Sequence, residues 1–246
     1  MTEARTDRVA IVTGGSGGIG QATSLRLSRD CSAVVVHYSG SEKKAAEAVQ
    51  SIEDVGGSAI AVKGDIGDEG DVAALFDKTT EVYGGVDVVV NTAGIMLLAP
   101  LADLDFDDFD RMFRVNVRGA YLVTQQAARR GRPGGAIVNF SSSVTRLSQP
   151  NYSAYAGTKA AMEALTPILA KELAGKDITV NTVAPGPVAT PLFLQGKPQA
   201  AIDHLAEMAP MQRLGEPEDI AEVVAYLAGP ARWINGQVIY ANGGIA

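Results

Sequence analysis

A tyrosine and a lysine four residues apart carry the clearest chemical signal in this chain. Tyr155 and Lys159 stand in the run Tyr152-Ser-Ala-Tyr-Ala-Gly-Thr-Lys159, and residues four apart share one face of a helix. A phenol has an ordinary pKa of about 10 and is a poor base at neutral pH. Because a neighbouring ammonium favours the phenolate, we expect a lowered Tyr155 pKa and proton exchange with an alcohol or carbonyl oxygen. Tyr152 has only Ala156 at the corresponding position, which favours a packing or substrate-contacting role.

A glycine-rich turn is the second motif. The β-branched run 9–13 leads directly into Gly14-Gly-Ser-Gly-Gly-Ile-Gly20, and a helical pattern follows. Strand, glycine turn and helix in this order are typical of a site where a dinucleotide pyrophosphate meets a helix N-terminus. An ordinary flexible loop is the alternative. Two spacings are open at this point: G-x-G-x-x-G counted from Gly15, and T-G-x-x-x-G-x-G with Gly14 as its first glycine.

The end of the second β-branched run bears on the choice of cofactor. It reads His37-Tyr-Ser-Gly-Ser41, with Lys43 and Lys44 beyond it and no acid before Glu42. A carboxylate there would bind the ribose 2′-hydroxyl of NAD and repel a 2′-phosphate. Hydroxyls, free N–H groups and a helix start would bind that phosphate. We therefore expect NADP(H), while the absence of an arginine nearby leaves NAD(H) open as a weaker or second cofactor.

Short β-branched runs alternate with longer helical patterns along the whole chain. The predicted strands are 9–13, 33–37, 59–63, 86–91, 136–141, 179–184 and 237–241. The predicted helices are 19–29, 41–55, 68–83, 105–130, 152–174 and 216–228. This alternation, with apolar residues on both strand faces, predicts one α/β domain over 1–246, a doubly wound parallel seven-stranded sheet with helices on both faces.

One long irregular segment, 185–210, interrupts the pattern after the sixth predicted strand. Ligands of open α/β sheets bind beyond the carboxyl ends of the strands, and long segments there are usually functional loops. We therefore expect a substrate-binding lid at 187–211. Its apolar residues predict an apolar pocket: Leu192, Phe193, Leu194, Leu205, Met208 and Met211.

Composition and charge exclude several classes of protein. The chain has 46% apolar and 20% charged residues and a net charge of −7, so we expect no nucleic-acid or membrane partner. The one basic cluster, Arg129, Arg130 and Arg132, is more typical of a solvated helix end than of a docking site. Cys31 has no second cysteine to pair with, and no Cys/His group has metal spacing. From this spacing we expect a metal-free protein. Residues 1–8 are polar and no apolar run reaches about 20 residues, so we also expect a cytoplasmic protein.

Taken together, the motifs resemble the short-chain dehydrogenase/reductase family, in its shorter branch, and imply a Rossmann-type fold. The glycine turn resembles that branch's T-G-x-x-x-G-x-G, which settles the spacing. Asn91-Thr-Ala-Gly94 resembles the family's N-N-A-G, with Thr92 in place of the second asparagine. The remaining matches, in chain order, are Asn116, the Tyr155–Lys159 pair, Pro185-Gly186 with Thr190, and Gly243-Gly244.

The resemblance also implies catalytic roles. Ser142, which lies 13 residues before Tyr155, is identified as the serine that binds the substrate oxygen; Ser141 or Ser143 would be its neighbours. Tyr155 would exchange the proton, and Lys159 would hold the nicotinamide ribose and lower the tyrosine pKa. Asn116 would anchor a water that links Lys159 to solvent; a polar residue that stabilises local backbone is the alternative.

The same resemblance implies a set of cofactor contacts that extends along the carboxyl edge of the sheet. Asp65 is expected to hydrogen-bond the adenine, with capping of the helix before Asp68 as the alternative. The expected NADP(H)-binding residues are Gly14, Ser16, Gly17, Gly18, Ile19, Gly20, His37, Tyr38, Ser39, Ser41, Asp65, Ile66, Asn91, Ala93, Gly94, Tyr155, Lys159, Pro185, Gly186, Val188 and Thr190.

The implied activity is hydride transfer between NADP(H) and a small-molecule ketone or secondary alcohol. A carbonyl reductase is the first expectation. A 3-oxoacyl-carrier-protein reductase, which could dock its acidic carrier on Arg129–Arg132, and a non-catalytic dinucleotide-binding regulator are the alternatives. The resemblance further implies a homotetramer, or a homodimer, formed through the last helices and the final strand. Trp233 and Tyr240 would suit that interface. Burial of these two side chains within one subunit is the alternative.

Overall fold

The strands of the chain form one parallel sheet. The computed structural model describes residues 7–246. Most of the polar segment 1–8 therefore lies outside the described residues. The strands are β1 (Val9–Thr13), β2 (Ala33–Tyr38), β3 (Ala59–Lys63), β4 (Val86–Asn91), β5 (Gly131–Phe140), β6 (Thr179–Pro185) and β7 (Val238–Ala241). Their order is β3-β2-β1-β4-β5-β6-β7 with every neighbouring pair parallel, which confirms the predicted doubly wound fold.

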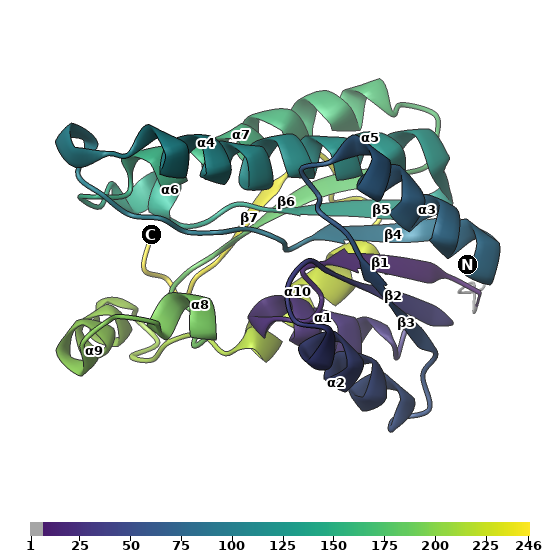
Figure 1. Ribbon diagram of the computed structural model, residues 1–246, viewed down its shortest axis with the longest axis horizontal. Coiled ribbons are helices and arrows are strands. Elements are labelled where there is room, and N and C mark those ends of the chain that lie inside the picture. The colour runs from purple at the N-terminus through teal and green to yellow at the C-terminus, as the bar shows by residue number, and fades with distance from the viewer. Residues whose placement is uncertain (1–6) are drawn as a thin grey trace.

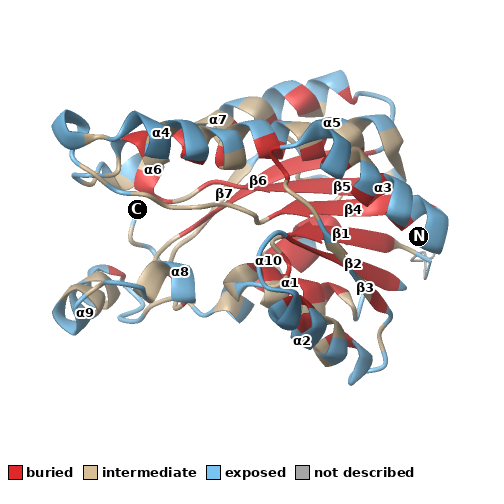
Figure 2. Ribbon diagram, in the orientation of Figure 1, coloured by how far each residue is buried: buried red, intermediate tan, exposed pale blue. Residues whose placement is uncertain are grey.

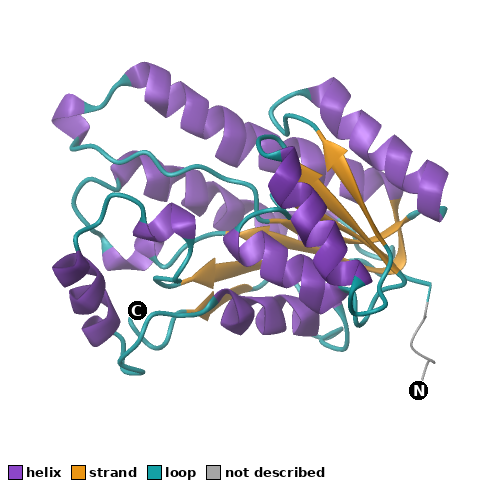
Figure 3. Cartoon of the chain, turned by 60° about the horizontal axis from the view of Figure 1, so that its bottom comes forward, coloured by secondary structure: helices purple, strands orange, loops and turns teal. Residues whose placement is uncertain are grey.

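Helices cover both faces of this sheet (Figure 1, Figure 3). The long ones are α1 (Gly18–Leu27), α2 (Glu42–Glu53), α3 (Glu69–Tyr83), α4 (Phe106–Phe113), α5 (Ala120–Arg130), α7 (Ser153–Glu172), α9 (Gln199–Met208) and α10 (Pro217–Ala228). Short helical segments are η1 (Leu101–Asp103), η2 (Arg114–Gly119), α6 (Val144–Leu147) and α8 (Pro191–Leu194). Helices α1, α2 and α10 pack on one face, and α3, α5 and α7 on the other.

The alternation of side chains along the strands explains the two layers. Val34 and Val36 belong to the apolar cluster shared with α2 and α10, whereas Val35 between them belongs to the cluster shared with α3, α5 and α7. Successive side chains of a strand point to opposite faces, so a strand covered on both faces is apolar throughout. The sheet is accordingly the buried centre of the molecule (Figure 2).

Most predicted boundaries differ from the structure by one or two residues, but two differ more. Strand β5 begins at Gly131 rather than at 136, because Gly131 already pairs with Val86 across a register shift. The helix predicted at 105–130 is three segments: α4, a π-helical segment η2, and α5. No proline or glycine cluster announces this break, so the helical pattern runs through it.

Segment 185–210 is not irregular throughout. It contains the helices α8 and α9, which lie beyond the carboxyl ends of the strands, at the left of Figure 1. Thr190 begins α8, because its hydroxyl accepts a hydrogen bond from the Phe193 N–H (3.2 Å). The role of 187–211 as a lid stays a prediction. Among residues 7–246, no helix combines the length and apolar character that crossing a bilayer requires.

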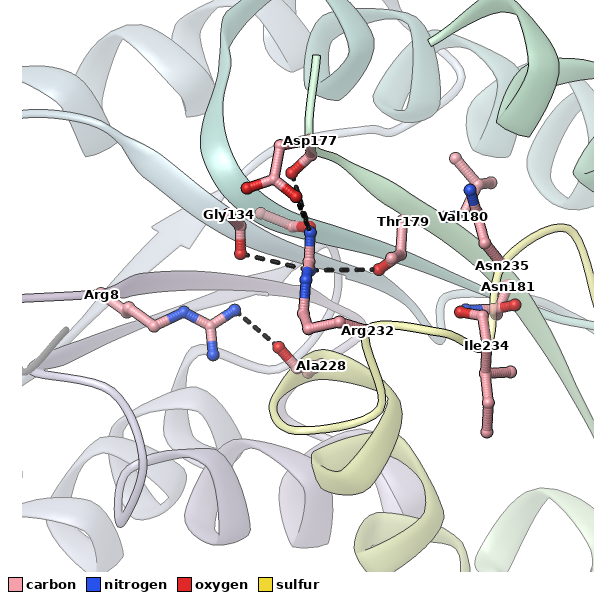
Figure 4. Close-up of polar contacts among 11 residues, drawn as sticks. Arg8, Gly134, Asp177, Thr179, Val180, Asn181, Ala228, Arg232, Ile234 and Asn235 are labelled. Atoms are coloured by element: carbon pink, nitrogen blue, oxygen red, sulfur yellow. Dashed lines mark hydrogen bonds and ion pairs between the residues drawn. The ribbon is translucent and has the colours of Figure 1, made fainter. Parts of the chain in front are cut away.

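The edge of the sheet opposite the glycine turn is tied together by arginines. Arg232 donates to the carbonyl oxygen of Gly135 (2.8 Å) and to Asp177 (2.9 Å to Oδ1), joining the loop before β7 to the starts of β5 and β6 (Figure 4). The adjacent Trp233 is 100% exposed, so the expectation of burial is wrong for this residue. Its loop is anchored, yet its ring contacts solvent.

The basic cluster at the end of α5 is largely neutralised by partners. Arg130 forms an ion pair with Asp77 (2.8 Å), and Arg132 forms one with the buried Asp87. Arg129 is exposed. Two of the three guanidiniums therefore serve local structure.

Candidate active site

The predicted catalytic residues meet at the carboxyl edge of the sheet, around a cavity of about 160 Å³. Ser142, Tyr155 and Lys159 all line it, as do Gly94 at the end of β4 and Thr190 at the start of α8. These residues come from four different elements, so only the fold brings them together. Ligands of open α/β sheets bind at this edge.

Helix α7 places Tyr155 and Lys159 one turn apart, as predicted. The Lys159 Nζ lies 5.7 Å from the centroid of the Tyr155 ring. The ammonium is buried and donates to the carbonyl oxygen of Phe140 (3.2 Å), at the end of β5. The hydroxyl of Ser142 is hydrogen-bonded to that of Tyr155. Serine and tyrosine therefore present two neighbouring hydroxyls to the cavity.

The ionisation of this pair differs from the prediction. Burial raises the pKa of Tyr155 to about 12; Tyr152 adds to the rise, and the hydrogen bond from Ser142 opposes it. Burial also lowers the pKa of Lys159 to about 8. The predicted lowering of the tyrosine pKa by Lys159 is wrong for the protein alone. The ammonium is bonded to Phe140 rather than to the phenol oxygen, and removal from water outweighs its field.

The three consecutive serines have different surroundings. Ser141 donates to Glu163 (2.6 Å), away from Tyr155. The hydroxyl of Ser143 donates to the carbonyl oxygen of Ala184 (3.4 Å). Ser142 Oγ accepts a long hydrogen bond from the Val144 N–H (3.3 Å) and remains beside Tyr155. These contacts support Ser142 as the serine that faces a substrate oxygen.

Asn116 lies within the π-helical segment η2 and is buried. Its Oδ1 accepts from the Ile95 N–H (2.8 Å), and its Nδ2 donates to the Ile95 carbonyl oxygen (2.8 Å) and to Thr158 (3.2 Å). These are the contacts of a residue that stabilises backbone. The predicted link through water to Lys159 stays a prediction. Single-turn π segments inside helices recur at functional sites.

The glycine turn fits a pyrophosphate. Helix α1 has Gly17 as its N-cap, with no side chain capping its first N–H groups, so these donors are available to an anion. A Cβ at Gly17 would meet no atom closer than 3.9 Å, whereas one at Gly20 would lie 2.2 Å from the Gly14 carbonyl oxygen. The turn therefore has free space at Gly17 and is closely packed at Gly20. Ser16 and Ile19 belong to the same turn, and Ile19 lines the cavity.

His37 contacts the backbone of the glycine turn. Its ring is 3% exposed. Nδ1 accepts from the Gly14 N–H (3.4 Å), and Nε2 donates to the carbonyl oxygen of Gly64 (3.0 Å), the only tautomer that satisfies both neighbours. Both ring nitrogens are engaged within the protein, and the cofactor contact expected of His37 stays a prediction. Its contribution is to position the turn.

The end of β2 contains the groups expected near a 2′-phosphate. Tyr38 is buried, Ser39 is exposed, and Ser41 is the N-cap of α2, accepting from the Lys44 N–H (3.3 Å). No acidic side chain precedes Glu42 in this stretch. The site fits NADP(H), because hydroxyls and a helix start are present there and no carboxylate that would repel a 2′-phosphate precedes Glu42.

Asp65 has a partner that the sequence did not reveal. Its Oδ2 accepts from Arg114 (2.6 Å) and its Oδ1 from the Gly67 N–H (2.8 Å). Burial acts to raise the pKa of Asp65, but the hydrogen bonds from Arg114 and from the Gly67 N–H outweigh it and lower that pKa. Asp68, not Asp65, caps α3. The adenine contact of Asp65 stays a prediction.

The other predicted cofactor residues lie along the same edge. Asn91 is buried and donates to Asn139 (2.7 Å) and Thr124 (3.0 Å), which joins β4 to β5 and α5. Ile66 is buried in the cluster with α3 and α5. The residues at or after the ends of β4 and β6 are Ala93, Gly94, Pro185, Gly186 and Val188; all but Ala93 line the cavity.

Sequence reasoning missed two polar residues near this site. Glu163 accepts hydrogen bonds from three hydroxyls beside Ser142, and Gln149 lines the cavity. Glu163 follows Lys159 by four residues, so continuing the Tyr155–Lys159 spacing by one turn would have found it. Gln149 lies in a turn without periodicity and gave no signal.

Known proteins resemble this chain over nearly its full length. A family model described as enoyl-(acyl carrier protein) reductase matches residues 14–246. A short-chain type dehydrogenase/reductase of Picea abies is 42% identical, over 96% of this chain and 92% of the relative. An NADPH-dependent aldehyde reductase-like chloroplastic protein of Arabidopsis thaliana is 39% identical, over 96% and 93%. A short chain dehydrogenase of Burkholderia cenocepacia J2315, solved with NADP, is 37% identical over 99% of both chains, with a TM-score of 0.92.

A parallel sheet whose glycine turn adjoins paired serine and tyrosine hydroxyls defines an oxidoreductase that acts on alcohol or carbonyl groups. The chain belongs to the short-chain dehydrogenase/reductase family, as its motifs predicted. The NADP(H) prediction agrees with the names of these relatives.

Proposed function

We propose that the protein is an NADP(H)-dependent carbonyl reductase that converts a neutral ketone or aldehyde to an alcohol. The observation that carries this proposal is the pair of hydrogen-bonded hydroxyls, Ser142 and Tyr155, at an otherwise largely apolar cavity. The nicotinamide supplies the hydride when bound. Ser142 donates a hydrogen bond to the substrate oxygen and stabilises the negative charge that develops there.

Tyr155 donates the proton to that oxygen. With a pKa raised to about 12 by burial, the phenol is protonated at neutral pH, which is the state required of a proton donor. Lys159 would hold the ribose hydroxyls, and Asn116 would keep the backbone at Ile95 and the Lys159 helix in place.

The cavity lining favours an uncharged substrate. Among the described residues that line it, Lys159 alone has a charged side chain. The apolar side chains around it include Met96, Val144, Leu147, Leu192, Phe193 and Leu205. Burying a charged group against such walls without a partner is unfavourable. A neutral ketone or aldehyde with an apolar body satisfies the site.

A 3-oxoacyl-carrier-protein reductase is the second candidate. The description of the matching family model, an enoyl-(acyl carrier protein) reductase, supports only the carrier-bound kind of substrate and not the bond that is reduced. An acidic carrier needs a basic docking surface. Because Arg130 and Arg132 are already in ion pairs, only Arg129 of the basic cluster is free of an ion pair among the described residues. The carbonyl reductase therefore has the stronger support.

The test is a screen of carbonyl compounds with NADPH, read by the absorbance of the reduced nicotinamide. Neutral aryl ketones and aldehydes should be reduced faster than acetoacetyl thioesters. Tyr155→Phe should lower kcat by about 10²–10⁴-fold while NADPH binding, followed by its fluorescence, persists. Tyr121→Phe, at an exposed position on α5, is the matched control. Activity of the Tyr155→Phe protein close to that of wild type would exclude the proposal.

We propose NADP(H) over NAD(H), supported by the hydroxyls and the acid-free end of β2. The ratio of kcat/KM for NADPH and NADH measures this preference. A higher value for NADH would contradict it.

We also propose a homotetramer, or a homodimer, that covers the fully exposed Trp233 and the exposed Tyr226. Such large exposed aromatics near one edge suit an interface between copies. Gel filtration with light scattering tests this, and a monomer at micromolar concentration would contradict it.

For location we propose the cytoplasm, supported by the single cysteine, Cys31, which is buried and whose pKa burial raises to about 11. Cell fractionation tests it.

A further inference from the structure

Glu163 lies on α7 one turn beyond Lys159, and its carboxylate collects three hydroxyl donors. Ser141 donates to Oε1 (2.6 Å), Thr145 donates to the same oxygen (2.8 Å), and Tyr240 of β7 contacts both oxygens (3.1 and 3.2 Å). Within residues 7–246 this carboxylate has no cationic partner in an ion pair. The group is therefore organised by neutral donors alone.

Two of these donors bracket Ser142. Ser141 is the residue before it, and Thr145 lies three residues after it. Thr145 also closes the turn on Ser142, since its N–H (3.2 Å) and its hydroxyl (3.0 Å) both contact the Ser142 carbonyl oxygen. The Glu163 carboxylate thus holds both sides of the turn that carries Ser142. We call this turn, residues 141–147, the serine turn.

The third donor joins the network to the final strand. The Tyr240 hydroxyl reaches Glu163 from β7, and the guanidinium of Arg146 on α6 lies 3.6 Å from the centroid of the Tyr240 ring. Asn242, just after β7, donates to the hydroxyl of Ser143 (3.1 Å). The serine turn is therefore held from α7 and from β7 together.

We propose that Glu163 is a positioning residue that aligns Ser142 with Tyr155. It ties the serine turn to the same helix that bears Tyr155 and Lys159, so the two reacting hydroxyls keep one relative geometry. Its donors are uncharged, so the role requires hydrogen-bond acceptors and not a negative charge. The inference rests on the proposed reductase activity and names a further residue on which that activity depends.

The main experiment compares three substitutions by steady-state kinetics with NADPH and the best ketone of the screen. Glu163→Ala removes the acceptors and should lower kcat by about 100-fold, the order of loss expected when a reacting group is displaced by about 1 Å. The Kd of NADPH should stay within about twofold, because no hydrogen bond among the described residues joins the turn that carries Ser142 to the glycine turn. Glu163→Gln keeps an acceptor for Ser141 and Thr145, and its amide can donate to Tyr240, so kcat should recover to within about threefold of wild type. Glu172→Ala, an exposed carboxylate on the same helix, is the matched control.

Either of two kinetic results with the Glu163 variants would overturn the proposal. One is a kcat of Glu163→Ala within about twofold of wild type in a folded protein. The other is an equal loss in Glu163→Gln and Glu163→Ala, which would mean that the charge matters rather than the acceptors. If Glu163→Ala does not fold, Tyr240→Phe serves instead; it deletes one donor and should lower kcat by about fivefold, and an unchanged kcat refutes the network.

Amide hydrogen exchange separates this inference from the proposed function. In Glu163→Ala the amides of 141–147 should exchange faster, while those of β1 and α10 stay protected; in Glu163→Gln the serine turn should remain as in wild type. If the wild-type protein reduces no carbonyl compound, the proposed function is wrong. If the amides of 141–147 in Glu163→Ala are protected as in wild type, the positioning role of Glu163 is wrong, whether or not the reductase activity is found.

Discussion

His37 makes the stability of this protein depend on pH in a defined window. Its ring is 3% exposed and donates to the Gly64 carbonyl oxygen while accepting from the Gly14 N–H. Burial lowers the pKa of His37 below its usual value, and this outweighs the opposing effects of the Gly64 bond, Asp65 and Asp71. The folded state therefore keeps the ring neutral at a pH where the unfolded chain, with a pKa of about 6.5, takes up a proton.

The sign and size of the effect follow from proton linkage. Above about pH 6.5 neither state binds the proton, and the full stabilisation is present. Below it the unfolded state binds more protons, so the free energy of unfolding falls as pH drops, by at most about 1.4 kcal/mol per pH unit. The fall ends when the pH reaches the lowered pKa of the folded state. Asp65 and Asp219, whose pKa values are also lowered, lose their contribution only near and below about pH 4, outside this window.

Urea unfolding at pH 8, 7, 6 and 5 measures this dependence. His37→Gln does not titrate, so its free energy of unfolding should change less between about pH 6.5 and 5 than that of wild type. It should also be lower by roughly 1–3 kcal/mol at pH 7, because one of the two partly buried backbone groups at Gly14 and Gly64 loses its partner. His204→Gln, at an exposed position on α9, is the matched control. Parallel pH dependence of wild type and His37→Gln would refute the reasoning.

Three further predictions concern the site and its support. Ser142→Ala should lower kcat by about 10²–10³-fold, because it removes a donor to the substrate oxygen; an unchanged kcat in the nicotinamide absorbance assay contradicts this. Arg132→Ala removes the guanidinium hydrogen bonds from the Asp87 carboxylate, whose side chain is 2% exposed, and should lower the free energy of unfolding in urea by about 1.5–3 kcal/mol; a loss below about 1 kcal/mol would exclude that role. Gly20→Ala places a Cβ 2.2 Å from a backbone oxygen of the glycine turn and should abolish NADPH binding in a fluorescence titration. Gly40→Ala, whose Cβ meets nothing within 4 Å, should bind NADPH as wild type does, and equal binding by both variants would count against the tight turn.

The sequence by itself determined the architecture and the location of the chemistry. Strand and helix periodicities are local properties, so apolar runs such as that of β2 and the alternating helices predicted the doubly wound sheet correctly. The spacing of Tyr155 and Lys159 also needs only one helix. Family motifs located the glycine turn and the serine run, and the fold brings them to one edge of the sheet.

The tertiary structure decided what surrounds each of these groups. The predicted helix 105–130 contains the π segment η2, because packing of Asn116 against Ile95 overrides a continuous helical pattern. His37 turned out to support the glycine turn, since its two partners come from segments 23 and 27 residues away.

The same holds for ionisation and for the alignment of the reacting hydroxyls. The lysine four residues away predicted an acidic Tyr155, yet burial raises its pKa to about 12, because removal from water depends on every element packed around the ring. Glu163 finds its donors on β5, α6 and β7, contacts that no local spacing encodes. Residue types and spacings supply the reactive groups; desolvation and hydrogen bonds between distant segments determine how those groups behave.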